Sequence, residues 1–112
     1  MGKTITEKIL SKYANKNLKP EEIVSVPVDR LIFMDSKSVE VFSYFEGDLG
    51  QTHLKNPDRI VMVCDHLGIG HDTASAQIIE QFRLKAKKYG IKNFYGIGNT
   101  GIGHQIKLED GF

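Results

Sequence analysis

An uninterrupted apolar run, Ile-Val-Met-Val-Cys at residues 60–64, constrains the fold of this chain more than any other feature of its sequence. Its length and β-branched content are typical of a strand that is buried on both faces of a parallel sheet. Two polar residues, Asp65 and His66, follow at once. Because open α/β sheets bind their ligands at the carboxyl ends of the strands, this point is the first candidate for a functional site.

The segments around this run alternate between helix and strand patterns. N-terminal capping residues and three-and-four apolar spacing predict helices over residues 5–14, 35–46 and 73–89. Short apolar or β-branched runs predict strands at 23–28, 31–33, 91–95 and 104–106. Pro27 places the first of these strands at a sheet edge or breaks it near its end. The alternation predicts a single α/β domain over residues 1–112, a layered α/β/α fold with a mostly parallel sheet and right-handed crossovers.

The composition excludes several classes of function. With 112 residues the chain is long enough for one domain, and 15 basic against 14 acidic residues give no electrostatic footprint for nucleic acid or an anionic membrane. A single cysteine, Cys64, excludes an internal disulfide and a metal or iron–sulfur cage built from the chain's own thiolates. It is expected to be a small core residue. The single cysteine also predicts a cytoplasmic protein in the reducing cytosol. No segment has the length of a transmembrane span and the amino terminus lacks the apolar core of a secretory signal, so we expect a soluble chain.

Asp65 and His66 admit two interpretations. As a catalytic pair, the carboxylate would orient the imidazole for proton transfer; alternatively, they are an ordinary polar strand end. His104 follows a glycine-rich turn at residues 96–103 and either faces the same crevice or lies on the surface. The turn itself is a poor candidate for phosphate binding, because a strand and not a helix is expected after it.

Five motifs occur in an order that points to a known family. They are Gly2-Lys3-Thr4-Ile5 with Glu7-Lys8-Ile9-Leu10; Val26-Pro27-Val28-Asp29 followed by Asp35; Asp58-Arg59-Ile60-Val61 leading into Asp65-His66; Lys88-Tyr89-Gly90-Ile91-Lys92-Asn93-Phe94; and Gly101-Ile102-Gly103-His104-Gln105-Ile106 with Glu109. In this combination the chain resembles the amino-terminal portion of the aconitase family, closest to the large subunits of 3-isopropylmalate dehydratase and homoaconitase. The resemblance runs nearly end to end and implies a partial version of the first aconitase domain.

The resemblance also implies a chemistry. Members of the family are hydro-lyases that dehydrate and rehydrate a small carboxylic acid over a [4Fe-4S] cluster. The pair matching Asp65 and His66 helps to protonate the departing hydroxyl, and the histidine matching His104 lies beside the cluster. Asp35 and Ser36 match a substrate-contacting segment, although this chain has Asp-Ser-Lys where the family has Asp-Gly-Thr or Asp-Ala-Thr.

The family's three cluster cysteines have no counterpart here, and Cys64 matches none of them. Its serine base and its substrate-binding arginines are absent as well. We therefore expect no metal ligand and no cofactor in this chain alone. Three hypotheses follow: a part of a hydro-lyase completed by another chain, a non-catalytic domain that binds a small carboxylate, or an assembly module. Each leaves apolar faces to be covered, so a homo-oligomer or a complementing chain is the expected partner.

Overall fold

A three-stranded parallel sheet lies at the centre of the computed structural model, which describes residues 2–112. The strands are β1 (Leu31–Met34), β2 (Ile60–Val63) and β3 (Asn93–Tyr95), with β2 between the other two. All four residues of β2 are buried, as the apolar run predicted. The central strand is therefore covered on both faces, and its carboxyl end leads directly to Asp65 and His66.

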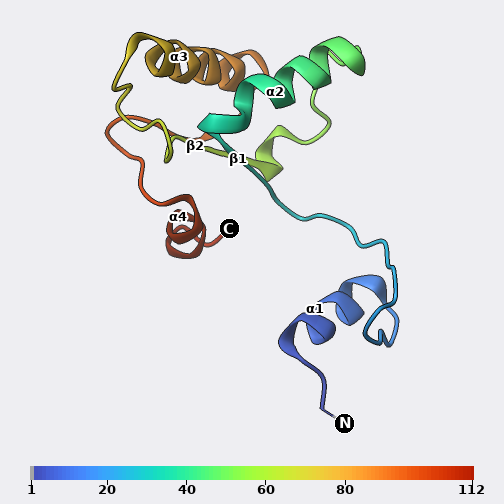
Figure 1. Ribbon diagram of the computed structural model, residues 1–112. Helices are drawn as coiled ribbons and strands as arrows, with labels where there is room; N and C mark the ends of the chain where they lie inside the picture. Colours follow the sequence, from blue (N-terminus) through green and yellow to red (C-terminus); the bar gives the residue numbers. More distant parts are fainter. Residues whose placement is uncertain (1) are drawn as a thin grey trace.

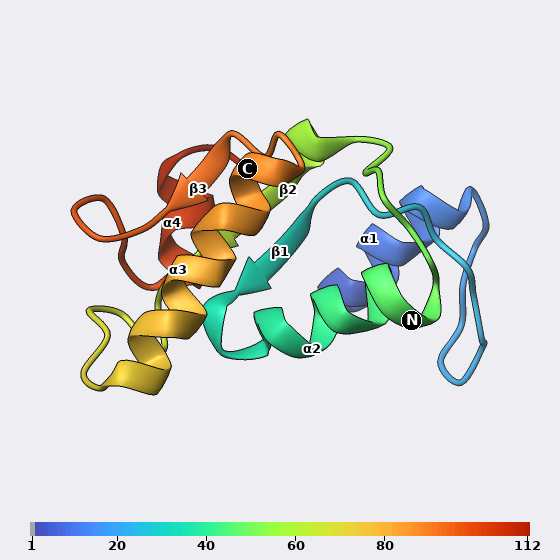
Figure 2. The same cartoon turned by 90° about the horizontal axis from the view of Figure 1, so that it is seen from above.

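Helices cover the two faces of the sheet unequally. On one side lie α2 (Ser38–Ser43) and α3 (Thr73–Lys88), and on the other lies α4 (Gly103–Glu109) (Figures 1 and 2). Met62 packs with Phe82 in the larger core beneath α2 and α3, whereas Val61 and Val63 pack with Ile106 of α4. This alternation of buried side chains along β2 produces the predicted α/β/α layers.

The longest helix begins and ends where its sequence predicts. The Asp72 side chain accepts a hydrogen bond from the Ser75 backbone amide at 2.7 Å and so caps the first turn of α3. Gly90 follows the helix with a φ of 68°, a conformation that glycine adopts without steric cost. Helix α1 (Ile5–Ala14) likewise begins with a capping box between Thr4 and Glu7.

The helix expected over residues 35–46 is divided into three parts. A 3-10 turn at Asp35–Lys37 precedes α2, and a π-helical turn at Tyr44–Asp48 follows it. Glu46 in the π-helical turn forms ion pairs with Lys85 and Lys88 and accepts a hydrogen bond from Tyr89. These contacts tie the end of the α2 segment to α3.

Two predicted strands are absent from the described residues. Residues 23–28 have no regular secondary structure and pair with no strand, and Ile23 is fully exposed; Pro27 removes one ladder donor. The segment 104–106 is not a strand but lies within α4, because Ile106 packs on the second face of the sheet instead of extending its edge. The objection to phosphate binding that rested on a strand after Gly103 was therefore wrong.

The amino-terminal segment extends away from the sheet (Figure 1). No residue of α1 is buried, although Leu18, which follows it, is. None of the helices in residues 2–112 combines the length and the hydropathy needed to cross a membrane.

Candidate functional site

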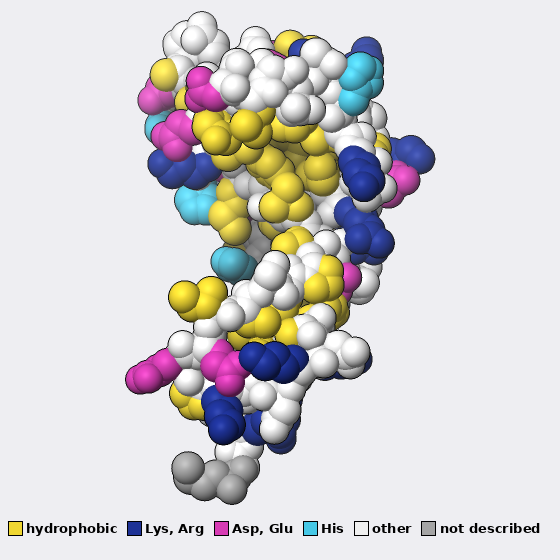
Figure 3. Space-filling view, turned by 90° about the vertical axis from the view of Figure 1, so that its right-hand side faces the viewer, with side chains coloured by type: hydrophobic (Ala, Val, Ile, Leu, Met, Phe, Trp, Pro, Cys, Tyr) yellow, Lys and Arg dark blue, Asp and Glu magenta, His cyan; other side chains and the backbone are white. Residues whose placement is uncertain are grey.

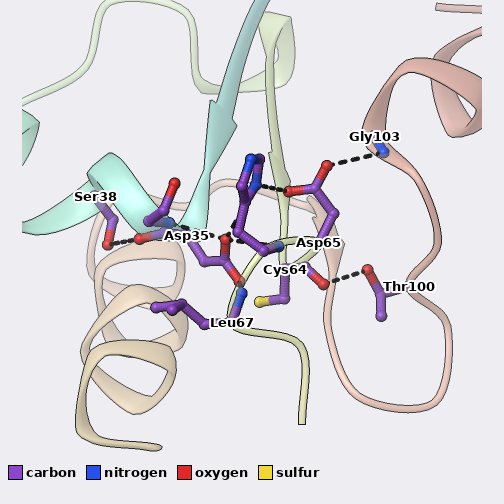
Figure 4. Close-up of polar contacts among 9 residues, drawn as sticks. Asp35, Ser38, Cys64, Asp65, Leu67, Thr100 and Gly103 are labelled. Atoms are coloured by element: carbon purple, nitrogen blue, oxygen red, sulfur yellow. Dashed lines mark hydrogen bonds and ion pairs between the residues drawn. The ribbon is translucent and has the colours of Figure 1, made fainter. Parts of the chain in front are cut away.

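Three of the predicted site residues meet where β1 and β2 end. Because Met34 pairs with Val63 in the parallel register, the next residues of the two strands bring Asp35, Asp65 and His66 together. One ligand atom from each of these side chains lies within 4.8 Å of the others. Figure 4 shows the two carboxylates approaching from adjacent strand ends, with α4 beyond Asp65.

Asp65 and His66 form a hydrogen-bonded pair. The His66 Nδ1 atom lies 2.6 Å from Asp65 Oδ1, and the other oxygen, Oδ2, accepts the Gly103 backbone amide at 3.1 Å. The Asp65 side chain is 10% exposed, whereas that of His66 is 53% exposed. Within residues 2–112 no hydrogen bond occupies His66 Nε2, so the ring is held at one nitrogen and open to a ligand at the other.

Asp35 lies behind this pair and is completely buried. Its Oδ1 accepts the backbone amides of Ser36 at 2.8 Å and His66 at 3.2 Å, and its Oδ2 accepts that of Leu67 at 2.9 Å. Because its carboxylate is buried, Asp35 has no exposed oxygen with which to make the predicted substrate contact in this structure. Ser36, the other predicted substrate-binding residue, is exposed beside it.

His104 reaches the same end of the sheet but does not join the pair. It lies exposed in the first turn of α4, directly after Gly103, and no hydrogen bond or ion pair joins it to Asp65 or His66 in the described chain. The contact between the Gly103 amide and Asp65 fixes the start of α4.

Two supporting contacts were not predicted from the sequence. The Thr100 hydroxyl donates to the Cys64 carbonyl at 2.8 Å, across the glycine-rich turn (Figure 4). At Gly103, a Cβ atom would lie 3.0 Å from Asp65 Oδ2, which is closer than side-chain carbons normally approach an oxygen. The position of Gly103 directly before the predicted site residue His104 could have indicated its close approach to Asp65, whereas nothing in the sequence indicated a role for Thr100.

The donor set of this chain does not fit an iron–sulfur cluster. Cys64 is its only cysteine, and its side chain is fully buried in the larger core. Burial, reinforced by the nearby carboxylates of Asp35 and Asp65, raises the pKa of the Cys64 thiol to about 11. A cluster ligand must be a thiolate that reaches the iron, so Cys64 is a core residue, as predicted.

Comparison with known proteins gives the same family as the motifs. No protein-family model matches the chain. It is, however, 35% identical over 111 residues to the 3-isopropylmalate dehydratase large subunit of Caldanaerobacter subterraneus subsp. tengcongensis, 38% over 111 residues to that of Wolinella succinogenes, and 39% over 109 residues to that of Sulfurisphaera tokodaii. These alignments cover 99%, 99% and 97% of this chain.

The chain is a relative of 3-isopropylmalate dehydratase large subunits. It spans only 26% of the length of each of these relatives. The resemblance inferred from the five motifs is confirmed, and the α/β/α layers agree with a partial aconitase-like domain. The part of the chain aligned with these relatives contains the hydrogen-bonded Asp65–His66 pair.

Proposed function

We propose that this chain contributes the Asp65–His66 pair to a hydro-lyase of the 3-isopropylmalate dehydratase kind, and that polypeptide beyond these 112 residues completes the active site. One observation carries the proposal. The His66 imidazole is anchored through Nδ1 to a nearly buried carboxylate, while Nε2 is open at the carboxyl end of a parallel sheet. A histidine held in this way is suited to proton transfer with a bound ligand.

In the dehydration direction, the Nε2 proton of an imidazolium moves to the hydroxyl oxygen as the carbon–oxygen bond breaks, so that water departs. The ring then keeps its proton on Nδ1, hydrogen-bonded to Asp65, which balances the positive charge before transfer and fixes the tautomer afterwards. In hydration, neutral His66 takes the proton back from water. The base that removes the carbon-bound proton is not assigned to this chain.

The substrate class follows from the relatives, whose name specifies 3-isopropylmalate. We infer a small hydroxy acid for the composite site and no particular acid within that class. The [4Fe-4S] cluster implied by the family would have to be held by cysteines of the completing polypeptide, because Cys64 does not fit that role. The single cysteine supports a location in the reducing cytosol.

Exposed apolar side chains support the need for a partner. On α1, Ile5, Ile9 and Tyr13 are 74%, 50% and 42% exposed and share one helical face. Apolar side chains also gather on the face shown in Figure 3. We propose that the polypeptide carrying the cluster cysteines covers these residues, since the relatives contain about three quarters of their length beyond the aligned part.

A second candidate function is carboxylate binding without turnover. It is favoured because this chain contains both members of the acid–base pair but only one cysteine, which is too few to hold a cluster. An imidazolium with a free Nε2–H would bind a carboxylate by a charge-assisted hydrogen bond.

The experiment compares His66→Ala with His53→Ala in the assembly formed by this chain and its completing polypeptide. His53 is exposed in the loop before β2 and serves as the matched control. We expect kcat for dehydration of 3-isopropylmalate to fall by at least about a hundredfold for His66→Ala, since general acid catalysis contributes that much. Unchanged kcat would reject the catalytic role; measurable carboxylate affinity without any turnover would select the second candidate.

A further inference from the structure

Asp35 connects β1 to the loop that carries His66, although no contact with a ligand is open to it. We propose that Asp35 is a positioning residue, which holds the His66 backbone so that the imidazole keeps its proton on Nδ1 and presents Nε2 outward. This inference rests on the proposed function only for the role of His66 Nε2 in proton transfer. The positioning itself can be measured without a substrate.

The carboxylate is bound as an acceptor for backbone amides. Three amides, those of Ser36, His66 and Leu67, converge on its two oxygens at 2.8, 3.2 and 2.9 Å, and the side chain is fully buried. Two of these donors belong to the loop after β2, so the Asp35 carboxylate ties that loop to the end of β1. A buried carboxylate is stable here because each oxygen is satisfied by N–H donors.

The same carboxylate acts on the ring directly. Asp35 Oδ1 lies 3.8 Å from His66 Nδ1, and Asp65 Oδ1 lies 2.6 Å from it. Both negative charges favour a hydrogen on Nδ1 over a lone pair facing them. In the neutral ring this leaves the lone pair on Nε2, which is the arrangement that His66 needs to take the proton back from water in the hydration direction.

The variant Asp35→Asn tests the proposal because it keeps the size of the side chain and removes one acceptor. Whichever way the amide is oriented, its NH2 group faces at least one of the backbone amides that the carboxylate accepted. Asp58→Asn is the matched control. It removes the same charge from an exposed carboxylate at the opposite end of β2.

Two measurements on the isolated, 15N-labelled chain report the positioning. In alkaline buffer, where an ordinary imidazole is neutral, the ratio of Nδ1–H to Nε2–H tautomers of His66 is expected to fall by about tenfold in Asp35→Asn. Amide hydrogen exchange at His66 and Leu67 is expected to accelerate by about tenfold or more. Asp58→Asn should change neither quantity.

The wild-type chain provides a second test if Asp35→Asn does not fold. There, the amides of His66 and Leu67 should exchange at least about tenfold more slowly than those of Gly68 and Ile69, which donate no hydrogen bond within residues 2–112. Equal exchange across the four amides, or a His66 ring already on the Nε2–H tautomer, would overturn the proposal.

Activity of the completed assembly separates this inference from the proposed function. A positioning residue predicts that Asp35→Asn lowers kcat by tenfold or more and leaves KM within about twofold. A rise in KM at constant kcat would instead make Asp35 a substrate-binding residue and overturn the positioning role. If the tautomer shifts as expected while His66→Ala retains full activity, the positioning holds and the proposed function fails.

Discussion

Replacing Gly103 by alanine should disturb the acid–base pair, whereas replacing Gly101 should not. A Cβ at Gly103 would lie 3.0 Å from Asp65 Oδ2, the same atom that accepts the Gly103 amide at 3.1 Å. At Gly101 the nearest atoms are side-chain carbons of Ile106 at 3.6 and 3.7 Å, an ordinary van der Waals separation. Neither glycine has a positive φ, so alanine is compatible with both backbone conformations.

The magnitudes follow from these contacts. If the carboxylate shifts away and the Gly103 hydrogen bond is lost, the cost is about 1.5–3 kcal/mol, because the acceptor is charged. Alanine in the first turn of α4 recovers at most about 1 kcal/mol over glycine. With the full recovery subtracted, the net loss for Gly103→Ala is about 0.5–2 kcal/mol in the free energy of unfolding. Gly101→Ala should be neutral or stabilising by up to about 1 kcal/mol.

Urea denaturation of the two variants measures this difference, and the NMR signals of the His66 ring report whether the pair has moved. We expect Gly103→Ala to be less stable than Gly101→Ala by about 2 kcal/mol and to shift the His66 ring resonances. Equal stability of the two variants with unchanged His66 resonances would refute the assignment of the Gly103 amide as a support for Asp65.

Three further predictions concern the core and its electrostatics. Phe82→Ala should lower the free energy of unfolding by about 3–5 kcal/mol in urea denaturation, because Phe82 is fully buried, whereas Leu84→Ala on the exposed side of α3 should cost less than about 1 kcal/mol. Hydrogen bonds, above all the one from Lys85, lower the pKa of Glu46 from 4.5 to about 2. The wild type should therefore have a higher free energy of unfolding than Glu46→Gln above pH 4.5, and this difference should disappear as the pH falls toward 2. A difference that stays constant over that range would contradict the pairing. Cys64, buried and with its pKa raised to about 11, should react with a thiol reagent only in denaturant, and rapid labelling of the native chain would show that the strand end is open.

The elements predicted correctly are those whose signals are local. The run at 60–64 gave β2 and the capping residue Asp72 gave the start of α3, because burial on both faces and helix capping leave direct traces in the sequence. The strand predicted at 23–28 failed because β-branched composition does not provide a neighbouring strand. The strand predicted at 104–106 was wrong because Ile106, a single apolar residue between polar neighbours, is compatible with a strand or a helix, and its packing against Val61 and Val63 is a tertiary contact that a short stretch of sequence does not contain.

In the candidate site, too, the feature with a local signal was predicted correctly, whereas the feature that depends on the tertiary structure was not. Adjacency in the chain was enough to predict the Asp65–His66 pair, and the hydrogen bond between the two side chains is present. The role of Asp35 depends on the parallel register of β1 and β2, which brings residues 35 and 66 together across the sheet and which no local pattern encodes. Sequence resemblance placed Asp35 toward a substrate, whereas its burial and three amide partners place it behind the histidine.

The composition of the native assembly decides whether this chain is part of a composite dehydratase. The chain is purified from its own host under gentle, anaerobic conditions, and the mass, the polypeptides and the iron content of the particle are determined. We expect a stoichiometric complex with polypeptide that carries three cluster cysteines, and about four iron atoms per site. An iron-free monomer or homo-oligomer of this chain alone would contradict it.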